Sequence, residues 1–222
     1  MNQILAALGK RSREAIAADL RPVTLRAGQV LCEPGEPPKW AYFPETAAAS
    51  IVRVMADSTV AEVGVIGREG FVGLETILRA GDPTSLNVCQ IPGTALAIRP
   101  DALRGHIEHG REIAAHVLRY VGGYCTMLGQ LIACNRLHRV DQRYARWMLM
   151  IADRTGRESF SMTHERLSMM LGARRPTVTA TTALLRDAGC IETSRGRVHI
   201  RDRKKLESYA CECYDICVAC FA

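Results

Sequence analysis

Proline is distributed unevenly along this chain of 222 residues, and its positions limit where helices can form. Eight of the nine prolines lie within the first 100 residues, and none occurs between Pro100 and Pro176. Proline removes a backbone donor and clashes with the preceding helical turn, so a segment rich in proline is poorly suited to helices. The sequence therefore predicts a strand-rich N-terminal part followed by a helical C-terminal part.

Short apolar or alternating runs, separated by turn-forming clusters, recur between Val23 and Ile98. The runs include residues 29–32, 50–54 and 95–98, and the clusters include residues 33–38, 67–70 and 81–83. Many short strands at such spacing are typical of a β-sandwich or barrel. We expect one such domain over residues 1–105.

A heptad pattern follows in the proline-free part of the chain. Six apolar residues succeed one another at steps of 4, 3, 4, 3 and 4, namely Ile113, Val117, Tyr120, Tyr124, Met127 and Leu131. This spacing places an apolar stripe along one helix face. We expect a long dimerisation helix over residues 106–138, with this stripe as the seam between two copies of the chain. The alternative is that the stripe packs on its own domain. Glycines at positions 122, 123 and 129 would each weaken the helix by about 1 kcal/mol relative to alanine.

Two short helices joined by a glycine-containing turn are predicted after Thr163. The Thr163 hydroxyl can cap the first helix, and Gly172 can end it in a left-handed conformation. Pro176 suits the first position of the second helix, which would run to Ala188, because its missing N–H is harmless there. A core helix over residues 140–152 precedes this pair. Such a pair is a helix-turn-helix, which lays its second helix in the major groove of DNA.

A β-hairpin around Arg195-Gly196 follows the two helices, as in a winged helix. We expect Arg175, at the entrance to the second helix, to read a base edge, and Arg195 and Arg197 to contact phosphates beside the groove. The full set of expected DNA-contacting residues is Arg174, Arg175, Pro176, Thr177, Thr179, Ala180, Arg195 and Arg197. The opposite face of the second helix, with Val178 and Leu185, would pack on the first.

Positive charge is concentrated in the same region. Residues 139–205 hold 15 Lys and Arg against 7 Asp and Glu, whereas the whole chain has a formal net charge of +6. This concentration favours a polyphosphate partner, although a solubilising surface would look similar. No apolar run is long enough to span a bilayer, and residues 4–8 are too short for a signal-peptide core. We therefore expect a cytoplasmic protein without a membrane partner, whose nine cysteines are reduced thiols.

These segments together resemble the Crp/Fnr superfamily of bacterial transcription regulators over nearly the whole chain. The matching segments are residues 26–36, Gly70-Phe71-Val72-Gly73, residues 142–147 and residues 167–191. The resemblance implies an α+β protein with an N-terminal double-stranded β-helix (jelly roll) as sensor, a dimerisation helix and a winged helix-turn-helix over residues 139–222, which includes a C-terminal helix. It further implies a homodimer on a two-fold symmetric DNA site. RNA polymerase is a further expected partner.

Members of that family that bind cyclic nucleotides carry a phosphate cassette, in which Gly-Glu is followed by an arginine. Here Gly73 is followed by Leu74, with Glu75 one place late, and the later stretch is Pro83-Thr-Ser-Leu86. No arginine stands where the phosphate would need one. We expect a sensor domain that does not bind cyclic AMP or GMP, and the sequence identifies no other effector.

Four cysteines crowd the C-terminus, at Cys211, Cys213, Cys217 and Cys220. Four thiolates could hold zinc or an iron-sulfur cluster, which makes a metal- or redox-responsive regulator the alternative function. Small apolar cysteines also pack well in a helix, and we predict no cofactor.

A metalloenzyme is the third hypothesis, because jelly-roll domains can carry catalytic metals. The clustered histidines, His106, His109 and His116, fall after the strands, and histidine on a helix is more often a packing residue than a ligand. We expect no enzymatic activity.

Overall fold

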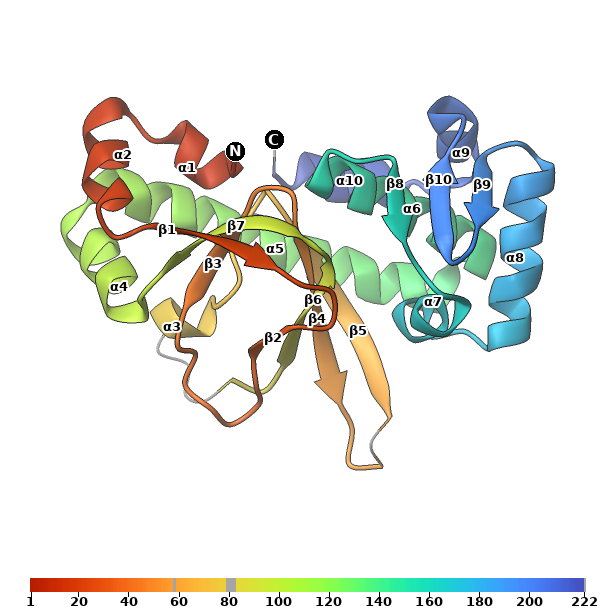
Figure 1. Ribbon diagram of the computed structural model, residues 1–222, viewed down its shortest axis with the longest axis horizontal. Coiled ribbons are helices and arrows are strands. Elements are labelled where there is room, and N and C mark those ends of the chain that lie inside the picture. The colour runs from red at the N-terminus through yellow and green to blue at the C-terminus, as the bar shows by residue number, and fades with distance from the viewer. Residues whose placement is uncertain (58, 79–82, 222) are drawn as a thin grey trace.

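The N-terminal part of the chain is a roll of two antiparallel sheets (Figure 1). The structure is a computed structural model and describes residues 1–57, 59–78 and 83–221. One sheet has the order β1-β7-β3 and the other β2-β6-β4-β5. The strands are β1 (Arg21–Leu25), β2 (Val30–Cys32), β3 (Ala41–Pro44), β4 (Ala48–Val54), β5 (Val60–Ile66), β6 (Leu86–Ile91) and β7 (Gly93–Ile98). Apolar side chains such as Leu25, Ile51 and Ile66 fill the interior, and the predicted jelly roll is confirmed.

Three short helices in this part were not expected from the sequence: α1 (Gln3–Ala7), α2 (Lys10–Ala17) and α3 (Glu75–Leu78). Helices this short are marginal alone and depend on tertiary contacts. Helix α1 is held by Asn2, a buried residue whose side-chain oxygen caps the helix. Its amide donates to the carbonyls of Pro44 at 3.0 Å and Gly70 at 2.7 Å, which fastens the helix to the roll.

The long helix expected from residue 106 is two helices in the structure, α4 (Pro100–His109) and α5 (Arg111–Leu137). Gly110, with φ −115° and ψ 98°, separates them. The glycines within α5 do not interrupt it. A Cβ on Gly123 would lie 2.2 Å from the carbonyl oxygen of Cys220, so this glycine permits the close approach of the C-terminal helix.

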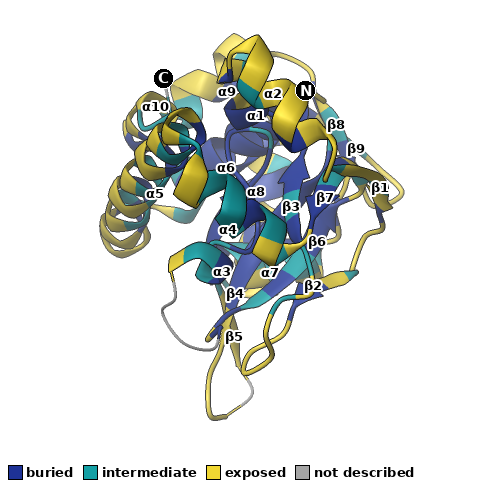
Figure 2. Cartoon of the chain, turned by 90° about the vertical axis from the view of Figure 1, so that its left-hand side faces the viewer, coloured by how far each residue is buried: buried dark blue, intermediate teal, exposed yellow. Residues whose placement is uncertain are grey.

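The heptad stripe of α5 faces the interior of its own chain. Ile113, Val117 and Tyr120 pack beneath the roll in one cluster, and Met127 and Leu131 lie in a second cluster farther along the helix. Tyr124 is half-buried between them. These side chains are therefore covered by their own chain, as in the alternative interpretation of the stripe. The exposed side of α5 is the opposite one (Figure 2).

The position of the Tyr120 ring explains why glycine stands at the start of the Gly70-Phe71-Val72-Gly73 segment. A Cβ on Gly70 would lie 2.1 Å from the Tyr120 ring, so only glycine lets the helix approach the roll here. The Tyr120 ring also lies against Phe71, with 5.4 Å between ring centroids. Gly73, at the end of the same motif, has φ +99°, a conformation that favours glycine.

The C-terminal part is a winged helix-turn-helix, as predicted. Its elements are α6 (Val140–Thr155), β8 (Ser159–Ser161), α7 (His164–Leu171), α8 (Arg175–Asp187), β9 (Ile191–Ser194), β10 (Arg197–Ile200), α9 (Arg203–Tyr209) and α10 (Cys213–Ala219). The three strands form a sheet in the order β8-β10-β9. Tyr144 and Met148 of α6 are fully buried in the core of this domain.

The helix α6 joins this domain to the roll. Its core cluster includes Ala48, Val65 and Ile91 from the strands. Across the same junction, Trp147 Nε1 donates to Glu62 Oε1 at 2.9 Å. Burial raises the pKa of Glu62 to about 7, against the lowering effect of its hydrogen bonds to Ser50 and Trp147. The two parts of the chain are therefore packed against each other through buried polar as well as apolar contacts.

Among the helices of the described ranges, none combines the length and the apolar character that crossing a membrane requires.

Candidate nucleic-acid interface

The first helix of the pair, α7, begins and ends as its sequence predicts. The Thr163 hydroxyl accepts a hydrogen bond from the backbone N–H of Arg166 at 3.3 Å, which satisfies a free donor of the first turn. Gly172 adopts a left-handed conformation with φ 55°, and its N–H returns to the last carbonyls of the helix. These local interactions place the turn that leads into α8.

The second helix, α8, begins one residue earlier than predicted. Arg174 is the extended residue at its N-cap, Arg175 occupies the first position and Pro176 the second. Since the first turn of a helix has no internal partners for its N–H groups, proline is tolerated at either position. Val178, Thr182 and Leu185 are buried against the domain core, as the sequence indicated.

The other side of α8 is open to solvent. All eight residues expected at the DNA surface have exposed side chains: Arg174, Arg175, Pro176, Thr177, Thr179, Ala180, Arg195 and Arg197. Within the described part of the chain, no carboxylate forms an ion pair with any of these four arginines, whereas Arg186 nearby is paired with Asp187 at 3.0 Å. The unpaired guanidinium groups are free to bind an anion.

The wing turns tightly at Arg195 and Gly196. Ser194 pairs with Arg197 across the hairpin, which leaves a two-residue loop. Both loop residues have positive φ, 45° for Arg195 and 76° for Gly196, as a type I′ turn requires. Glycine adopts this conformation freely, but an arginine Cβ is strained in it.

Two further contacts bring the wing tip and α8 to one side of the domain. The backbone N–H of Met162, just before α7, donates to the carbonyl of Gly196 at 2.7 Å. Two residues later, His164 Nδ1 lies 3.0 Å from the Thr179 hydroxyl on α8. The chain leading into α7 therefore bridges the wing and the second helix.

His164 was missed by the sequence analysis, although its position directly after the capping Thr163 is a signal for a residue near the helix start. The Thr179 hydroxyl donates to the Arg175 carbonyl at 3.0 Å, so it can still accept from His164. This arrangement orients the imidazole toward the first turns of α8.

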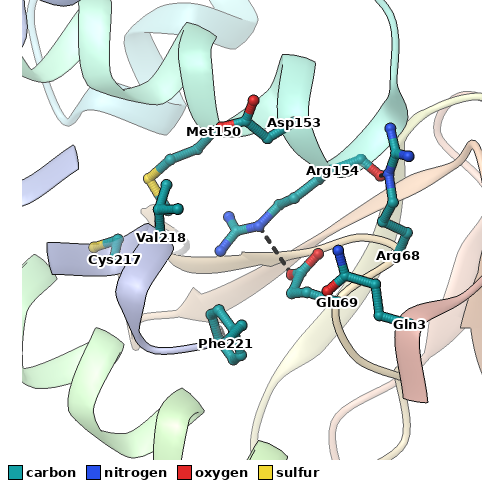
Figure 3. A pocket seen from close by; sticks show the side chains of 9 residues that line it. All are labelled: Gln3, Arg68, Glu69, Met150, Asp153, Arg154, Cys217, Val218 and Phe221. Carbon is teal, nitrogen blue, oxygen red and sulfur yellow. Dashed lines mark hydrogen bonds and ion pairs between the residues drawn. The ribbon is translucent and has the colours of Figure 1, made fainter. Parts of the chain in front are cut away.

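A pocket of about 210 Å³ lies where the roll, α6 and α10 meet (Figure 3). Within it, Arg154 Nε forms a buried ion pair with Glu69 Oε1 at 2.9 Å, and Arg154 Nη2 lies 2.9 Å from the Met127 sulfur. Met150 and Phe221 line the apolar side. A small molecule in this pocket would touch both parts of the chain.

The four C-terminal cysteines do not form one site. Cys217 packs in an apolar cluster with Met127, and the Cys220 thiol donates to the Ile216 carbonyl at 3.2 Å. Cys211 and Cys213 lie elsewhere, beside Cys134 and His138. The alternative in which these four thiolates share one metal does not match their positions, because Cys217 and Cys220 lie apart from Cys211 and Cys213.

The histidines of the metalloenzyme hypothesis also remain apart in the described part of the chain. His106 Nε2 contacts Asp19 Oδ2 at 2.8 Å, and His109 Nδ1 contacts the Gly105 carbonyl at 2.9 Å. Neither belongs to the one candidate group of metal ligands found among the described residues.

Comparison with known proteins matches both parts of the chain. Residues 142–209 match the Crp-like helix-turn-helix domain, and residues 22–109 match the cyclic nucleotide-binding domain. A CRP-like cAMP-activated global transcriptional regulator of Mycobacterium tuberculosis is 26% identical over 219 residues, covering 93% of this chain and 98% of the relative. These relatives are transcription regulators rather than enzymes.

Solved structures show the same fold. A transcriptional regulator of the CRP family from Thermus thermophilus superposes with a TM-score of 0.69 and 19% identity, over 85% of this chain and 96% of its own. FixK2 from Bradyrhizobium japonicum gives a TM-score of 0.71 and 15% identity, over 86% of this chain and 98% of its own.

The strain at the wing tip generates a stability prediction. Asparagine tolerates the left-handed region better than arginine, so Arg195→Asn should raise the free energy of unfolding by about 0.5–1 kcal/mol, measured by urea denaturation. Arg195→Ala is the matched control, because it removes the same charge but lacks the short polar side chain with which asparagine hydrogen-bonds locally in this conformation. Equal effects of the two substitutions would contradict the assignment of the gain to backbone strain.

Proposed function

Because this chain belongs to the Crp/Fnr family of transcription regulators, we propose that it binds a two-fold symmetric DNA site as a homodimer, through α8 and the wing. The observation that carries the proposal is the set of unpaired arginines on α8 and the wing tip, which the segment leading into α7 holds on one side of the domain. A positive surface of this kind releases counterions from DNA when it binds phosphates.

The exposed residues at the start of α8 have distinct roles in this proposal. Arg175 stands at the first position of α8 and reads a guanine edge, for which a guanidinium offers two parallel donors. Arg174, Thr177 and Thr179 contact phosphates, supported by the positive end of the helix dipole. For this contact the Thr179 hydroxyl donates to a phosphate oxygen in place of the Arg175 carbonyl. Pro176 and Ala180 leave the rest of the surface poor in hydrogen-bonding groups, so DNA shape contributes the remaining specificity.

Selection of bound duplexes from a random pool by the purified protein tests this function. We expect enrichment of a two-fold symmetric site with half-sites about 10 base pairs apart, since the recognition helices of a dimer enter successive major grooves. Arg175→Ala should relax one base position, at a cost of about 1–3 kcal/mol in discrimination. Arg197→Ala should weaken binding to all duplexes alike and reduce the salt slope by about 1.

Arg26→Ala changes an exposed arginine of the roll and is the control for general loss of charge. It should leave both the base preference and the salt slope of DNA binding unchanged. Failure to enrich any symmetric site, or identical behaviour of the Arg175 and Arg197 variants, would count against the proposed roles.

The outer face of α5 is the surface that we propose for dimerisation. Leu118, Cys125 and Ile132 follow one another at heptad spacing, and Leu118 and Ile132 are 68% and 74% exposed. Gly122 and Gly129 lie between them, and a Cβ added to either would meet nothing within 4 Å, so a second helix could approach closely there. This stripe is distinct from the buried heptad stripe on the inner face.

A charge on this outer face should separate the subunits. Ile132→Asp is expected to shift the protein from dimer to monomer in light scattering at micromolar concentration, because an unpaired carboxylate would have to be desolvated in the seam. Met55→Glu, at a 57% exposed apolar residue on the roll, is the matched control and should stay dimeric. A wild-type monomer, or an Ile132→Asp dimer of wild-type stability, would refute this interface.

We also propose that the roll does not bind cyclic AMP. In this it would differ from the mycobacterial relative, which is described as cAMP-activated. A buried cyclic phosphate needs a charged partner, and the described arginines of the strands, Arg21 and Arg53, are exposed. Arg53 instead donates to the carbonyl of Thr84 at 2.9 Å. Calorimetric titration with cyclic AMP should give no saturable heat and leave DNA affinity unchanged. Saturable binding at micromolar concentration would overturn this proposal.

A further inference from the structure

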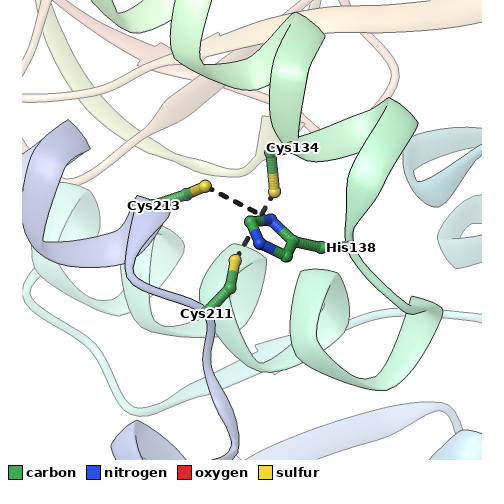
Figure 4. Close-up of side chains that lie close together, drawn as sticks. All are labelled: Cys134, His138, Cys211 and Cys213. Atoms are coloured by element: carbon green, nitrogen blue, oxygen red, sulfur yellow. Dashed lines mark hydrogen bonds between the residues drawn. The ribbon is translucent and has the colours of Figure 1, made fainter.

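Three cysteines and one histidine from two distant segments converge beside the end of α5 (Figure 4). Cys134 lies on the last turns of α5, and His138 is the residue that ends the helix. Cys211 lies between α9 and α10, and Cys213 is the first residue of α10. The ligand atoms of all four side chains lie within 4.8 Å of one another, and the three cysteines are buried.

We propose that these four residues bind a single zinc ion. Three thiolates and one imidazole form a recognised donor set of structural zinc sites. Around a tetrahedral ion at ordinary bond lengths, two sulfurs lie about 3.8 Å apart, and a sulfur and a nitrogen about 3.6 Å apart. The corresponding separations here are 3.5 Å between the Cys134 and Cys211 sulfurs and 3.4 Å between Cys213 Sγ and His138 Nδ1. Small side-chain adjustments would therefore admit the ion.

The imidazole of His138 is already oriented for this role. Its Nε2 lies 3.2 Å from Glu212 Oε1, so the Nε2–H can donate to the carboxylate and leave the Nδ1 lone pair directed at the three sulfurs. A carboxylate on the far nitrogen is the usual partner of a zinc-binding histidine, because it fixes the tautomer and the ring orientation. Gln130 Nε2 donates to Cys213 Sγ at 3.0 Å and steadies that ligand too.

Two buried positive charges lie beside the group of four residues. Arg143 and Arg146 of α6 are both buried, and among the described residues neither forms an ion pair with a carboxylate. Both guanidinium groups are close enough to Cys134 to interact with its charge. Zinc binding releases the thiol protons to solvent, and the complex of one dication with three thiolates carries one net negative charge. The two arginines would offset that charge.

The spacing of the donors selects a single ion. An iron-sulfur cluster interposes irons and sulfides between its ligands, so ligand atoms on different irons must lie farther apart than the 4.8 Å that encloses this group. Cys217 and Cys220, which belong to the same sequence cluster, remain outside the group.

The ion would connect parts of the chain that are 77 residues apart. One part ends the helix that we assign to dimerisation, and the other is the start of α10 with the residues just before it. The site includes neither α8 nor the wing. Metal binding at this site can therefore be tested independently of DNA binding.

Metal titration of the full-length protein tests the proposal. Protein freed of metal with a chelator under reductant should bind one Co²⁺ per chain with the absorption of thiolate-to-cobalt charge transfer, and one equivalent of Zn²⁺ should displace it. Cys213→Ser should lower the affinity for Co²⁺ at least tenfold. Cys220→Ser is the matched control from the same segment and should bind as the wild type does.

Two variants at half-buried or exposed positions cover the case in which a cysteine variant fails to fold. His138→Gln should lower the affinity at least tenfold, and Glu212→Gln, which keeps all four ligands, about tenfold. Absence of a thiolate charge-transfer band in the wild type, equal loss in Cys220→Ser, or a Cys134–Cys211 disulfide formed in place of metal uptake would overturn the proposal.

Discussion

The placement of the two parts of the chain depends on the packing of one face of α5 within the chain itself. Tyr120 fits against Gly70 and Phe71 of the roll, and farther along the helix Met127 meets α6 and α10. Both parts of the chain are therefore positioned by one rigid element. Because this face is buried inside the chain, we assign the outer face to contact with a second copy.

The junction between the two parts contains buried polar contacts as well as apolar ones. Glu62 meets Trp147 at one point, and Glu69 meets Arg154 at another. Buried polar groups are costly unless they are paired, so such contacts favour one relative placement of the roll and the winged helix over others. The pocket beside Arg154 opens at this junction, where occupancy would be felt by both parts.

The recognition surface and the cysteine group illustrate opposite relations between sequence and space. The residues expected to contact DNA lie within two short segments, and local turns suffice to expose them together. The cysteine group assembles from two segments that lie far apart in the chain, while Cys217, only four residues after Cys213, is directed into an apolar core. Proximity in the sequence was a good guide in the first case and a poor one in the second.

Features that depend on local hydrogen bonds and torsions could be predicted from the sequence alone: the cap at Thr163, the left-handed stop at Gly172, the two-residue turn at Arg195 and the period of the helices. Tertiary packing was needed to establish which face of α5 is buried and which cysteines meet. A heptad pattern records that a helix face is apolar, but not whether its own chain or a partner covers it. Likewise, a thiol carries no local signal for a ligand partner in a distant segment.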